Sequence, residues 1–242
     1  MIPELSLLRI KLYSDGADKK TMIEMASKPY IKGLTTNPTL MKKAGVKNYR
    51  LFAQEVLAEI RNKPISFEVF SDDLVEMKNQ ALEIASWAEN VYVKIPITNS
   101  KGVPTTEVIS YLSSNNVKLN ITAVLTSIQV AEIVSALNST VSNYISVFAG
   151  RIADTGVDPL PIMKDCLNLI AANPMSELIW ASPRELLNIF QADEIGCHII
   201  TATSDILSKI NLIGKDLTNY SLDTVKMFRN DAIESGFEIN EA

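Results

Sequence analysis

Short runs rich in β-branched and aromatic residues alternate along this sequence with longer stretches whose apolar residues recur every three or four positions. The short runs begin roughly 21 to 34 residues apart, which is the spacing of βαβ units. Eight such units in a chain of 242 residues predict an α/β fold, a (β/α)8 TIM barrel that forms a single domain over residues 1–242. The predicted strands are Leu8–Ser14, Ile31–Thr35, Ile65–Phe70, Val91–Ile97, Lys118–Val124, Tyr144–Ala149, Glu177–Ala181 and His198–Thr203.

An open doubly wound sheet would show the same alternation. Such sheets normally carry a glycine-rich first turn for a nucleotide, and neither G-x-G-x-x-G nor G-x-x-x-x-G-K-[ST] occurs here, so the pattern favours the barrel. Helical periodicity from Leu217 to Phe237 exceeds what eight units require and predicts a C-terminal helical extension over about residues 205–242. Within the barrel, the predicted helices include Tyr49–Ile60, Asp72–Trp87, Thr105–Leu112, Ser127–Leu137 and Pro161–Ala171.

The charge pattern limits the partners of the chain. A net charge of −5 and a pI near 5.1, without any Lys/Arg-rich run, make nucleic acid an unexpected partner, so an anionic ligand would need a few locally placed cations. The first residues lack the pattern of a secretory leader, and no stretch approaches the ~20 apolar residues of a membrane span. We therefore expect a cytoplasmic protein without membrane contact.

The cysteine and histidine content argues against metal or thiol chemistry. Cys166 and Cys197 lack CxxC spacing, and His198 is the single histidine of the chain, so neither a disulfide framework nor a zinc site is expected. His198 opens a short apolar strand, where a structural role is favoured over a catalytic one.

The run Val91–Thr98, VYVKIPIT, contains a lysine in the middle of a strand that is otherwise apolar. Side chains alternate between the two faces of a strand, so the four aliphatic residues face the helices and Lys94 faces the barrel interior together with Tyr92 and Pro96. A mid-strand lysine has no simple explanation as a surface residue. The alternative to a functional role is a buried ion pair with Glu68.

The same alternation puts further polar side chains inside the barrel. Ser66, Glu68 and Phe70 are predicted to face inward on the third strand. The fifth strand contributes Asn120, Thr122 and Val124, with Ala123 facing outward, and the sixth contributes Ser146 and Phe148. Polar residues also follow the strands at their carboxyl ends, where barrel enzymes build active sites. These residues are Asp15, Thr36, Asn37, Arg151, Ser182 and Arg184.

Several of these residues have structural alternatives. Asp15 is an alternative N-cap for the helix near Asp18, and Asn37 precedes a proline and suits a turn. Arg151 and Arg184 suit ordinary ion pairs at the mouth of the barrel. Burying this many polar groups without partners costs about 1–3 kcal/mol each, which favours a site as their common explanation.

A lysine in a low-dielectric interior loses affinity for its proton, and the free amine can attack a carbonyl to form a Schiff base. A protonated Schiff base permits cleavage of a nearby C–C bond, which is aldol chemistry without a metal. Such a reaction needs a base, a proton shuttle and donors for sugar hydroxyls. Residues of suitable type are Asp15, Glu68 with Thr122, and Asn37 with Asn120, while Arg151, Ser182 and Arg184 suit a phosphate.

The segments LYSDGAD, GLTTNPTL, FEVFSD, VYVKIPIT, LNITAV, SVFAGRIADTGVD and ASPR resemble the transaldolase family in order and strand position, over residues 8–235. The chain is most similar to the short type that includes the fructose-6-phosphate aldolases. The resemblance implies Lys94 as the Schiff-base nucleophile and Asp15 as the base. It implies that Glu68 with Thr122 activates the catalytic water. Asn37, Asn120 and Ser146 would contact the sugar, and Arg151, Ser182 and Arg184 would form the anion pocket.

The resemblance also separates the subfamilies. Aldolases of this type typically have glutamine and tyrosine where this chain has Glu68 and Phe148, so the resemblance implies a transaldolase that uses no cofactor or metal. It would act on sugar phosphates in the pentose phosphate pathway and form a homo-oligomer, a pentamer or decamer. Pro183 and Trp180 depart from the family pattern beside the expected anion pocket, with Trp180 expected inside the barrel, which leaves the donor open between sedoheptulose 7-phosphate, fructose 6-phosphate and another anionic ketose.

Overall fold

The computed structural model describes residue 5 and residues 7–239. Eight strands form a closed barrel in the order β1-β2-β3-β4-β5-β6-β7-β8, and each pairs with its neighbours in parallel. The predicted (β/α)8 barrel is therefore confirmed. The strands are β1 Lys11–Asp15, β2 Ile31–Thr35, β3 Ile65–Glu68, β4 Val91–Pro96, β5 Leu119–Val124, β6 Asn143–Val147, β7 Ser176–Trp180 and β8 Ile199–Thr203.

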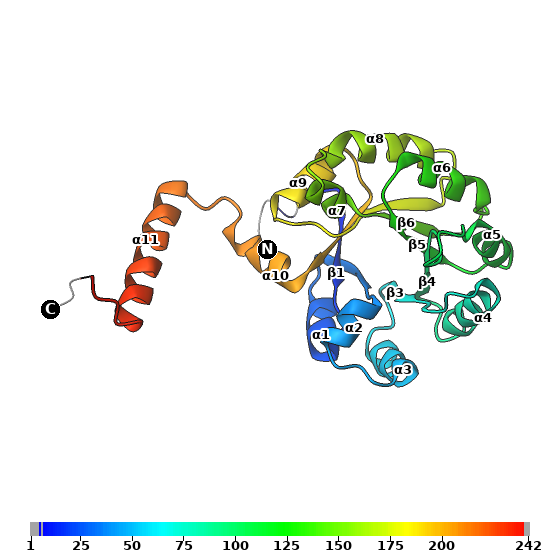
Figure 1. The fold of residues 1–242 in the computed structure, drawn as a ribbon, viewed down its shortest axis with the longest axis horizontal. Helices are drawn as coiled ribbons and strands as arrows, with labels where there is room; N and C mark the ends of the chain where they lie inside the picture. Colours follow the sequence, from blue (N-terminus) through cyan, green and yellow to red (C-terminus); the bar gives the residue numbers. More distant parts are fainter. Residues whose placement is uncertain (1–4, 6, 240–242) are drawn as a thin grey trace. The chain divides into compact units, whose positions relative to one another are not determined.

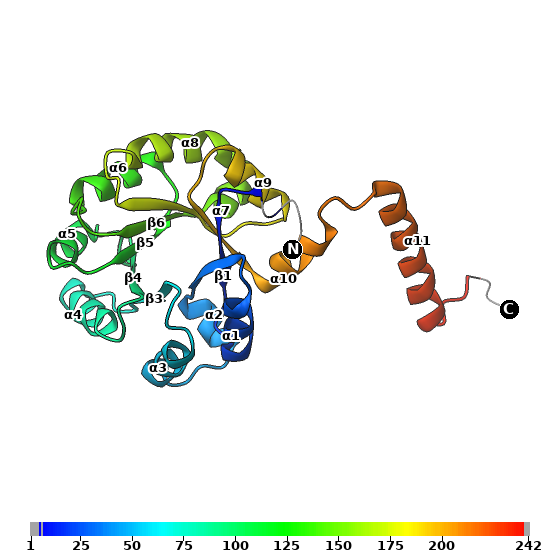
Figure 2. The same cartoon turned by 180° about the vertical axis from the view of Figure 1, so that it is seen from behind.

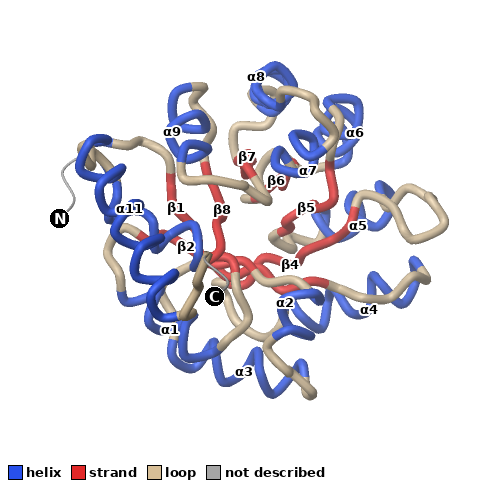
Figure 3. The backbone as a smooth tube through the Cα atoms, turned by 60° about the vertical axis from the view of Figure 1, so that its left-hand side comes forward, coloured by secondary structure: helices blue, strands red, loops and turns tan. Residues whose placement is uncertain are grey.

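Helices surround the strands within the barrel unit (Figure 1, and from behind in Figure 2). Figure 3 shows the strands in red inside a ring of blue helices. Several helices begin at a polar side chain that accepts a backbone N–H: Asp18, Asn48 and Asp73 cap α1, α3 and α4 in this way. The helices are α1 Lys19–Ser27, α2 Pro38–Lys43, α3 Tyr49–Glu59, α4 Leu74–Ala85, α5 Thr106–Ser114, α6 Ser127–Ala136, α7 Ala149–Asp154, α8 Pro159–Ile170, α9 Leu187–Glu194 and α10 Ser204–Ser208.

The chain divides into two compact units, one reaching Ser208 and the other beginning at Lys209. The second unit contains the short 3-10 helix η2 Lys209–Leu212 and the 18-residue helix α11 Leu217–Glu234, which has no buried residue. The predicted helix at Leu217–Phe237 is thus present and ends a few residues earlier. Among the described residues, no helix is both long and apolar enough to cross a membrane.

A layer of three tyrosines fills the barrel beneath the carboxyl ends of the strands. Tyr13, Tyr92 and Tyr144 are buried; the Tyr13 and Tyr144 hydroxyls lie 2.8 Å apart, and the Tyr92 and Tyr144 rings stack. Gly33 makes room for this layer, because a Cβ there would overlap the Tyr13 ring. Tyr13, Tyr92 and Tyr144 stand two residues before Asp15, Lys94 and Ser146, on the same face of their strands. The tyrosines therefore form a floor under those three polar side chains.

Two predicted orientations at strand ends are wrong. β3 ends at Glu68, because the backbone N–H groups of Phe70 and Ser71 donate to Gln80 Oε1, and Phe70 is 67% exposed rather than inside. In β5 the pairing with β6 shifts register between Ile121 and Val124, and Ala123 has φ +61°. The bulge reverses the alternation, so Ala123 faces inward and the buried Val124 pairs with Val147.

The predicted inward position of Trp180 is also wrong. Its neighbours Ile179 and Ala181 belong to the interior cluster with the tyrosines, so alternation turns Trp180 toward the helices, where it is 1% exposed. Trp180 therefore departs from the family pattern without entering the barrel.

Candidate active site

A cavity of about 770 Å³ opens at the carboxyl ends of the strands. The residues that the sequence predicts for the site line this cavity, except Asn120 and Thr36; the Thr36 side chain is buried and donates to the Ser66 carbonyl. The lining residues with polar or aromatic side chains from that set are Asp15, Asn37, Glu68, Lys94, Thr122, Ser146, Phe148, Arg151, Ser182 and Arg184. Seven separate segments of the chain thus contribute these residues to one cavity. It lies at the end of the barrel where barrel enzymes carry out catalysis.

Lys94 lies in the middle of β4 and is 5% exposed. Its Nζ donates to the Thr36 carbonyl at 2.9 Å and lies 3.3 Å from Glu68 Oε2. Glu68, Lys94 and Asn120 are register partners on adjacent strands, which is why the carboxylate and the amine meet at the same level. The ion pair expected as the structural alternative is present, and it lies inside the cavity rather than sealed away from it.

Asp15 does not cap a helix, since Asp18 caps α1. It accepts from Thr35 Oγ1 at 2.7 Å. Burial raises the pKa of Asp15 and of Glu68 above their ordinary values, against the opposing charge of Lys94. The cavity thus holds two partly buried carboxyl groups that retain a proton more readily than exposed ones, as proton-transfer groups require.

Thr122 follows Asn120 on β5 and is buried, yet its Oγ1 has no hydrogen-bond partner among the residues that the structure describes. The neighbouring Ala123 takes the left-handed backbone conformation that makes the bulge, and both residues line the cavity. An unpartnered buried hydroxyl is costly unless a ligand or water pairs with it. Thr122 therefore offers a polar contact to whatever occupies the cavity.

Asn120 lies behind the cavity wall and is fully buried. Its Nδ2 donates to Ser66 Oγ at 2.9 Å, and its Oδ1 accepts from Ser146 Oγ at 2.7 Å. The structure thus joins Asn120 to Ser146, which does line the cavity, and fixes the Ser146 rotamer. Asn37 caps α2 by accepting from Leu40 N at 2.9 Å, which leaves its amide nitrogen for the cavity.

The three residues predicted to bind an anion gather at one side of the cavity. Ser182 has φ +59°, and the Arg151 guanidinium lies 5.5 Å from the centre of the Phe148 ring. Arg184 forms a two-point ion pair with Asp154, in which Nε and Nη2 each contact one carboxylate oxygen. The ion pair expected for Arg184 as the alternative to anion binding is therefore present. It leaves Arg184 Nη1 without a protein acceptor among the described residues.

Sequence reasoning missed several residues of this site. Thr35 and Thr201 line the cavity and hydrogen-bond to each other, and Thr203 lines it next to them. The alternation applied to β4 would have placed both β8 threonines inside as well. No such pattern predicts the role of Asp154, because its ion pair with Arg184 depends on how α7 meets the segment after β7.

His198 lies outside this cavity. Its Nδ1 accepts from Leu178 N at 3.0 Å, and burial lowers its pKa, which agrees with the structural role expected for it. Cys166 and Cys197 are both free and buried. Among the described residues, no three His, Cys, Asp or Glu side chains gather in a way that could hold a metal ion.

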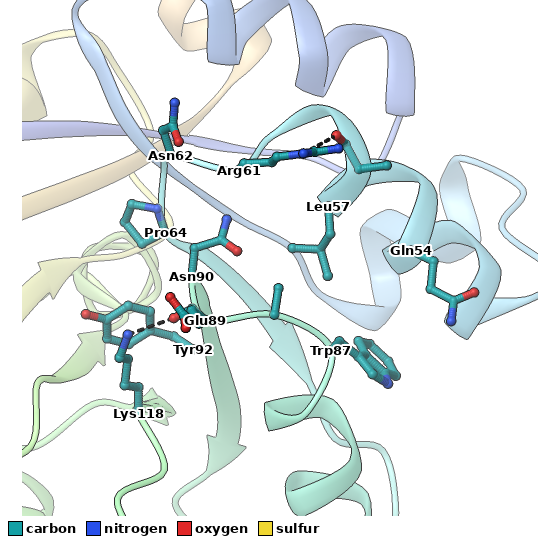
Figure 4. Close-up of a pocket in the computed structure, with 12 residues that line it drawn as sticks. Gln54, Leu57, Arg61, Asn62, Pro64, Trp87, Glu89, Asn90, Tyr92 and Lys118 are labelled. Carbon is teal, nitrogen blue, oxygen red and sulfur yellow. Dashed lines mark hydrogen bonds between the residues drawn. The ribbon is translucent and has the colours of Figure 1, made fainter.

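A second cavity of about 770 Å³ lies at the opposite, amino-terminal ends of β3, β4 and β5. Figure 4 shows its cations turned to backbone acceptors: Lys118 Nζ donates to the Glu89 carbonyl at 2.7 Å, and Arg61 Nε donates to the Ala58 carbonyl at 3.0 Å. It contains neither Lys94 nor the two partly buried carboxyl groups. Lys94, Asp15 and Glu68 thus lie in the cavity at the carboxyl ends of the strands.

Comparisons with known proteins agree with this geometry. A family model described as transaldolase/fructose-6-phosphate aldolase matches residues 12–241. A probable transaldolase of Dehalococcoides mccartyi is 32% identical over 202 residues, covering 83% of this chain and 90% of that protein. A probable transaldolase of Thermoanaerobacter sp. is 30% identical over 231 residues, covering 95% and 100%. One from Streptococcus agalactiae is 32% identical over 216 residues, covering 89% and 95%. The chain belongs to the transaldolase/fructose-6-phosphate aldolase family.

Proposed function

We propose that this protein is a transaldolase that moves a dihydroxyacetone unit from a ketose phosphate to an aldose phosphate through a Schiff base on Lys94. The observation that carries the proposal is the buried Lys94 amine, 3.3 Å from Glu68, on the wall of a cavity that also presents Asp15. Family membership supports the same reaction class.

The reaction begins when Lys94 gives a proton to Glu68 and its free amine attacks the ketose carbonyl carbon, which forms a C–N bond. The resulting carbinolamine loses water and becomes a protonated imine. Glu68 is close enough to Lys94 to exchange protons during this dehydration, and the unpartnered Thr122 hydroxyl holds the departing water. The same pair returns the water when the product is released.

The imine then withdraws electrons from the neighbouring carbon. Asp15 takes the proton of the hydroxyl on the next carbon, the C–C bond between these carbons breaks, and an aldose leaves while an enamine remains on Lys94. An acceptor aldehyde accepts the electron pair in the reverse of this step and receives its proton from Asp15. Every step balances without a cofactor or metal ion.

The substrates we propose are sedoheptulose 7-phosphate or fructose 6-phosphate as donor, and glyceraldehyde 3-phosphate or erythrose 4-phosphate as acceptor. Arg151, Ser182 and Arg184 meet the phosphate, since a guanidinium donates two hydrogen bonds to phosphate oxygens. Asn37 and Ser146 contact the sugar hydroxyls, and Asn120 orients Ser146. Sugar phosphates of this kind are metabolites of the cytoplasm, where we place the protein.

Borohydride reduction tests the Schiff base. Treatment with fructose 6-phosphate and borohydride should inactivate the protein and add mass to the peptide that contains Lys94. Lys118, in the opposite cavity, is the matched control and should stay unmodified. Label elsewhere, or retained activity in Lys94→Arg, contradicts the proposal.

The alternative product is free dihydroxyacetone, which an aldolase of the same family would release. Glu68 and Phe148, the residues that the family resemblance associates with transfer, both line the cavity. A coupled assay for dihydroxyacetone without any acceptor separates the two reactions. Release at a rate equal to transfer would assign the protein to the aldolases.

We also propose that the protein is a homo-oligomer in which α11 covers a second copy of the chain. The helix has no buried residue, and Leu217, Val225 and Phe228 lie along one stripe of it with more than half of each side chain exposed. Val225→Glu with Phe228→Glu should reduce the molar mass in light scattering to that of a monomer. Lys226→Glu, on the polar face, is the control, and an unchanged mass in the double variant contradicts the proposal.

A further inference from the structure

Three side chains from three neighbouring strands form a hydrogen-bonded chain that ends on Asp15. Thr201 Oγ1 on β8 lies 2.5 Å from Thr35 Oγ1 on β2, and Thr35 Oγ1 lies 2.7 Å from Asp15 Oδ1 on β1. β1 pairs with β2 on one side and with β8 on the other, so the chain crosses the inner face of β1. Thr35 is 1% and Thr201 5% exposed, which places both hydroxyls out of bulk water.

The direction of the protons follows from the chemistry of the groups. An ionised carboxylate only accepts, so the Thr35 hydroxyl must give its single proton to Asp15. Thr35 can then only accept from Thr201, which makes Thr201 the donor in their contact. Both hydroxyl protons are therefore committed toward the carboxylate, and hydrogen bonds to an ionised group are the strong ones in proteins.

We infer that Thr35 and Thr201 are positioning residues that hold Asp15 as an oriented carboxylate for proton transfer at the sugar hydroxyl. The inference rests on the proposed function, because it assigns Asp15 that transfer. Thr35 acts on Asp15 directly, and Thr201 acts through Thr35. Neither residue reacts with the sugar.

Other charged groups face Asp15 and set the background for its titration. Lys94 from β4 lowers the pKa of Asp15, and the Glu68 carboxyl from β3 interacts electrostatically with Asp15. Asp205 from α10 lines the same cavity. Asp18 and Lys43 line an adjoining cavity of about 400 Å³ that also borders Asp15. Substitutions of Thr35 and Thr201 leave all these charges in place, so they isolate the hydroxyl contribution.

The test measures kcat/KM against pH for Thr35→Val, Thr201→Val and the serine variants at both positions. Each valine variant should lose about tenfold or more of kcat/KM at neutral pH. The acidic limb should move upward by about one pH unit for Thr35→Val and by less for Thr201→Val, because the carboxylate loses a donor. The serine variants keep the hydroxyl and should restore the wild-type limb. Thr105→Val, at a buried threonine outside the cavity whose hydroxyl donates to the Pro96 carbonyl, should leave the limb in place.

Borohydride trapping distinguishes failure of this inference from failure of the proposed function. If Lys94 is labelled in every variant but the acidic limb does not move in the valine variants, the positioning role is overturned and the Schiff base stands. Equal losses in serine and valine variants would also overturn it. Absence of label in the wild-type protein would overturn the proposed function itself. Alanine variants replace any valine variant that does not unfold cooperatively.

Discussion

Arg184 and Asp154 form a two-point ion pair beside the cavity, with Nε and Nη2 of the arginine directed to the two carboxylate oxygens. Both side chains are about half exposed, and Arg184 also lines the cavity. A substrate phosphate must therefore share this guanidinium with a carboxylate of the protein. Asp154 orients Arg184 and at the same time neutralises much of the charge that would attract the phosphate.

Replacing Asp154 with asparagine should strengthen phosphate binding. The amide oxygen keeps an acceptor for Arg184 Nε, while the competing negative charge is lost. We expect the KM for a phosphorylated ketose to fall about two- to fivefold at low salt, the range of exposed ion pairs. The gain should shrink at high salt because exposed charges are screened.

The matched variant is Asp154→Ala, which removes the charge and the acceptor together. It should lose the orientation of Arg184 and show a smaller gain or none. Steady-state kinetics with a phosphorylated and an unphosphorylated ketose check the prediction. An equal change in KM for both ketoses would show that Asp154 does not act through the anion pocket.

Gly150→Ala should weaken binding at the anion pocket by displacing Ser182 and Arg184. A Cβ at Gly150 would overlap the backbone carbonyl of Ser182, which cannot rotate away as a side chain could. Ser182 and Arg184 must then move, so we expect KM for phosphorylated ketoses to rise at least tenfold, a change of about 1.4 kcal/mol. Borohydride labelling of Lys94 by dihydroxyacetone, which has no phosphate, should persist. Loss of that labelling in a folded variant would contradict a local effect.

How far the sequence predicted the molecule depends on whether a residue obeys strand periodicity. Lys94 and Glu68 do, so alternation predicts that both face the barrel interior, and the register between β3 and β4 adds that they lie at one level. Ala123 does not, because a bulge depends on pairing between two strands that lie apart in the sequence. Trp180 obeys periodicity as well, because Ile179 and Ala181 on either side of it face the interior, and its expected inward position is wrong for that reason.

Contacts between side chains of distant segments could not be predicted. The pair of Arg184 with Asp154 joins residues 30 positions apart, one at the end of α7 and the other in the irregular segment after β7, and no periodic signal predicts that they meet. The hydrogen bond from Thr201 to Thr35 depends on the register of β2 and β8 against β1, which a list of strands does not contain. The sequence therefore predicted which side chains enter the cavity better than which of them touch.

The raised pKa of Asp15 should make the free energy of unfolding depend on pH. Burial raises the pKa of Asp15, so between its unfolded and folded values the folded state binds more protons than the unfolded chain. The free energy of unfolding therefore falls as pH rises through this window, which begins near pH 4. Asp15→Asn removes this contribution. The unfolding free energy of Asp15→Asn should therefore increase relative to that of the wild type as pH rises.

Urea unfolding from pH 4 to pH 8 measures that difference. Asp18→Asn is a control of the same chemistry: hydrogen bonds from Thr21 lower the pKa of the Asp18 carboxyl, so its contribution to stability is lost only as pH falls through about 4 and below, and its difference should stay nearly constant above about pH 5. A difference for Asp15→Asn that stays constant with pH would contradict a raised pKa.

Trp180 should be replaceable by phenylalanine at little cost but not by alanine. Its indole is buried against the helices, and within the described part of the chain its Nε1 has no hydrogen-bond partner. Trp180→Phe removes an unsatisfied donor together with some apolar area, so the two effects offset and the unfolding free energy should change by less than about 1.5 kcal/mol. Trp180→Ala leaves a cavity and should cost about 3–5 kcal/mol. Because the side chain lies outside the barrel interior, KM of the folded phenylalanine variant should equal that of the wild type. If Trp180→Phe raised KM for phosphorylated ketoses alone, Trp180 would have to contribute to the anion pocket.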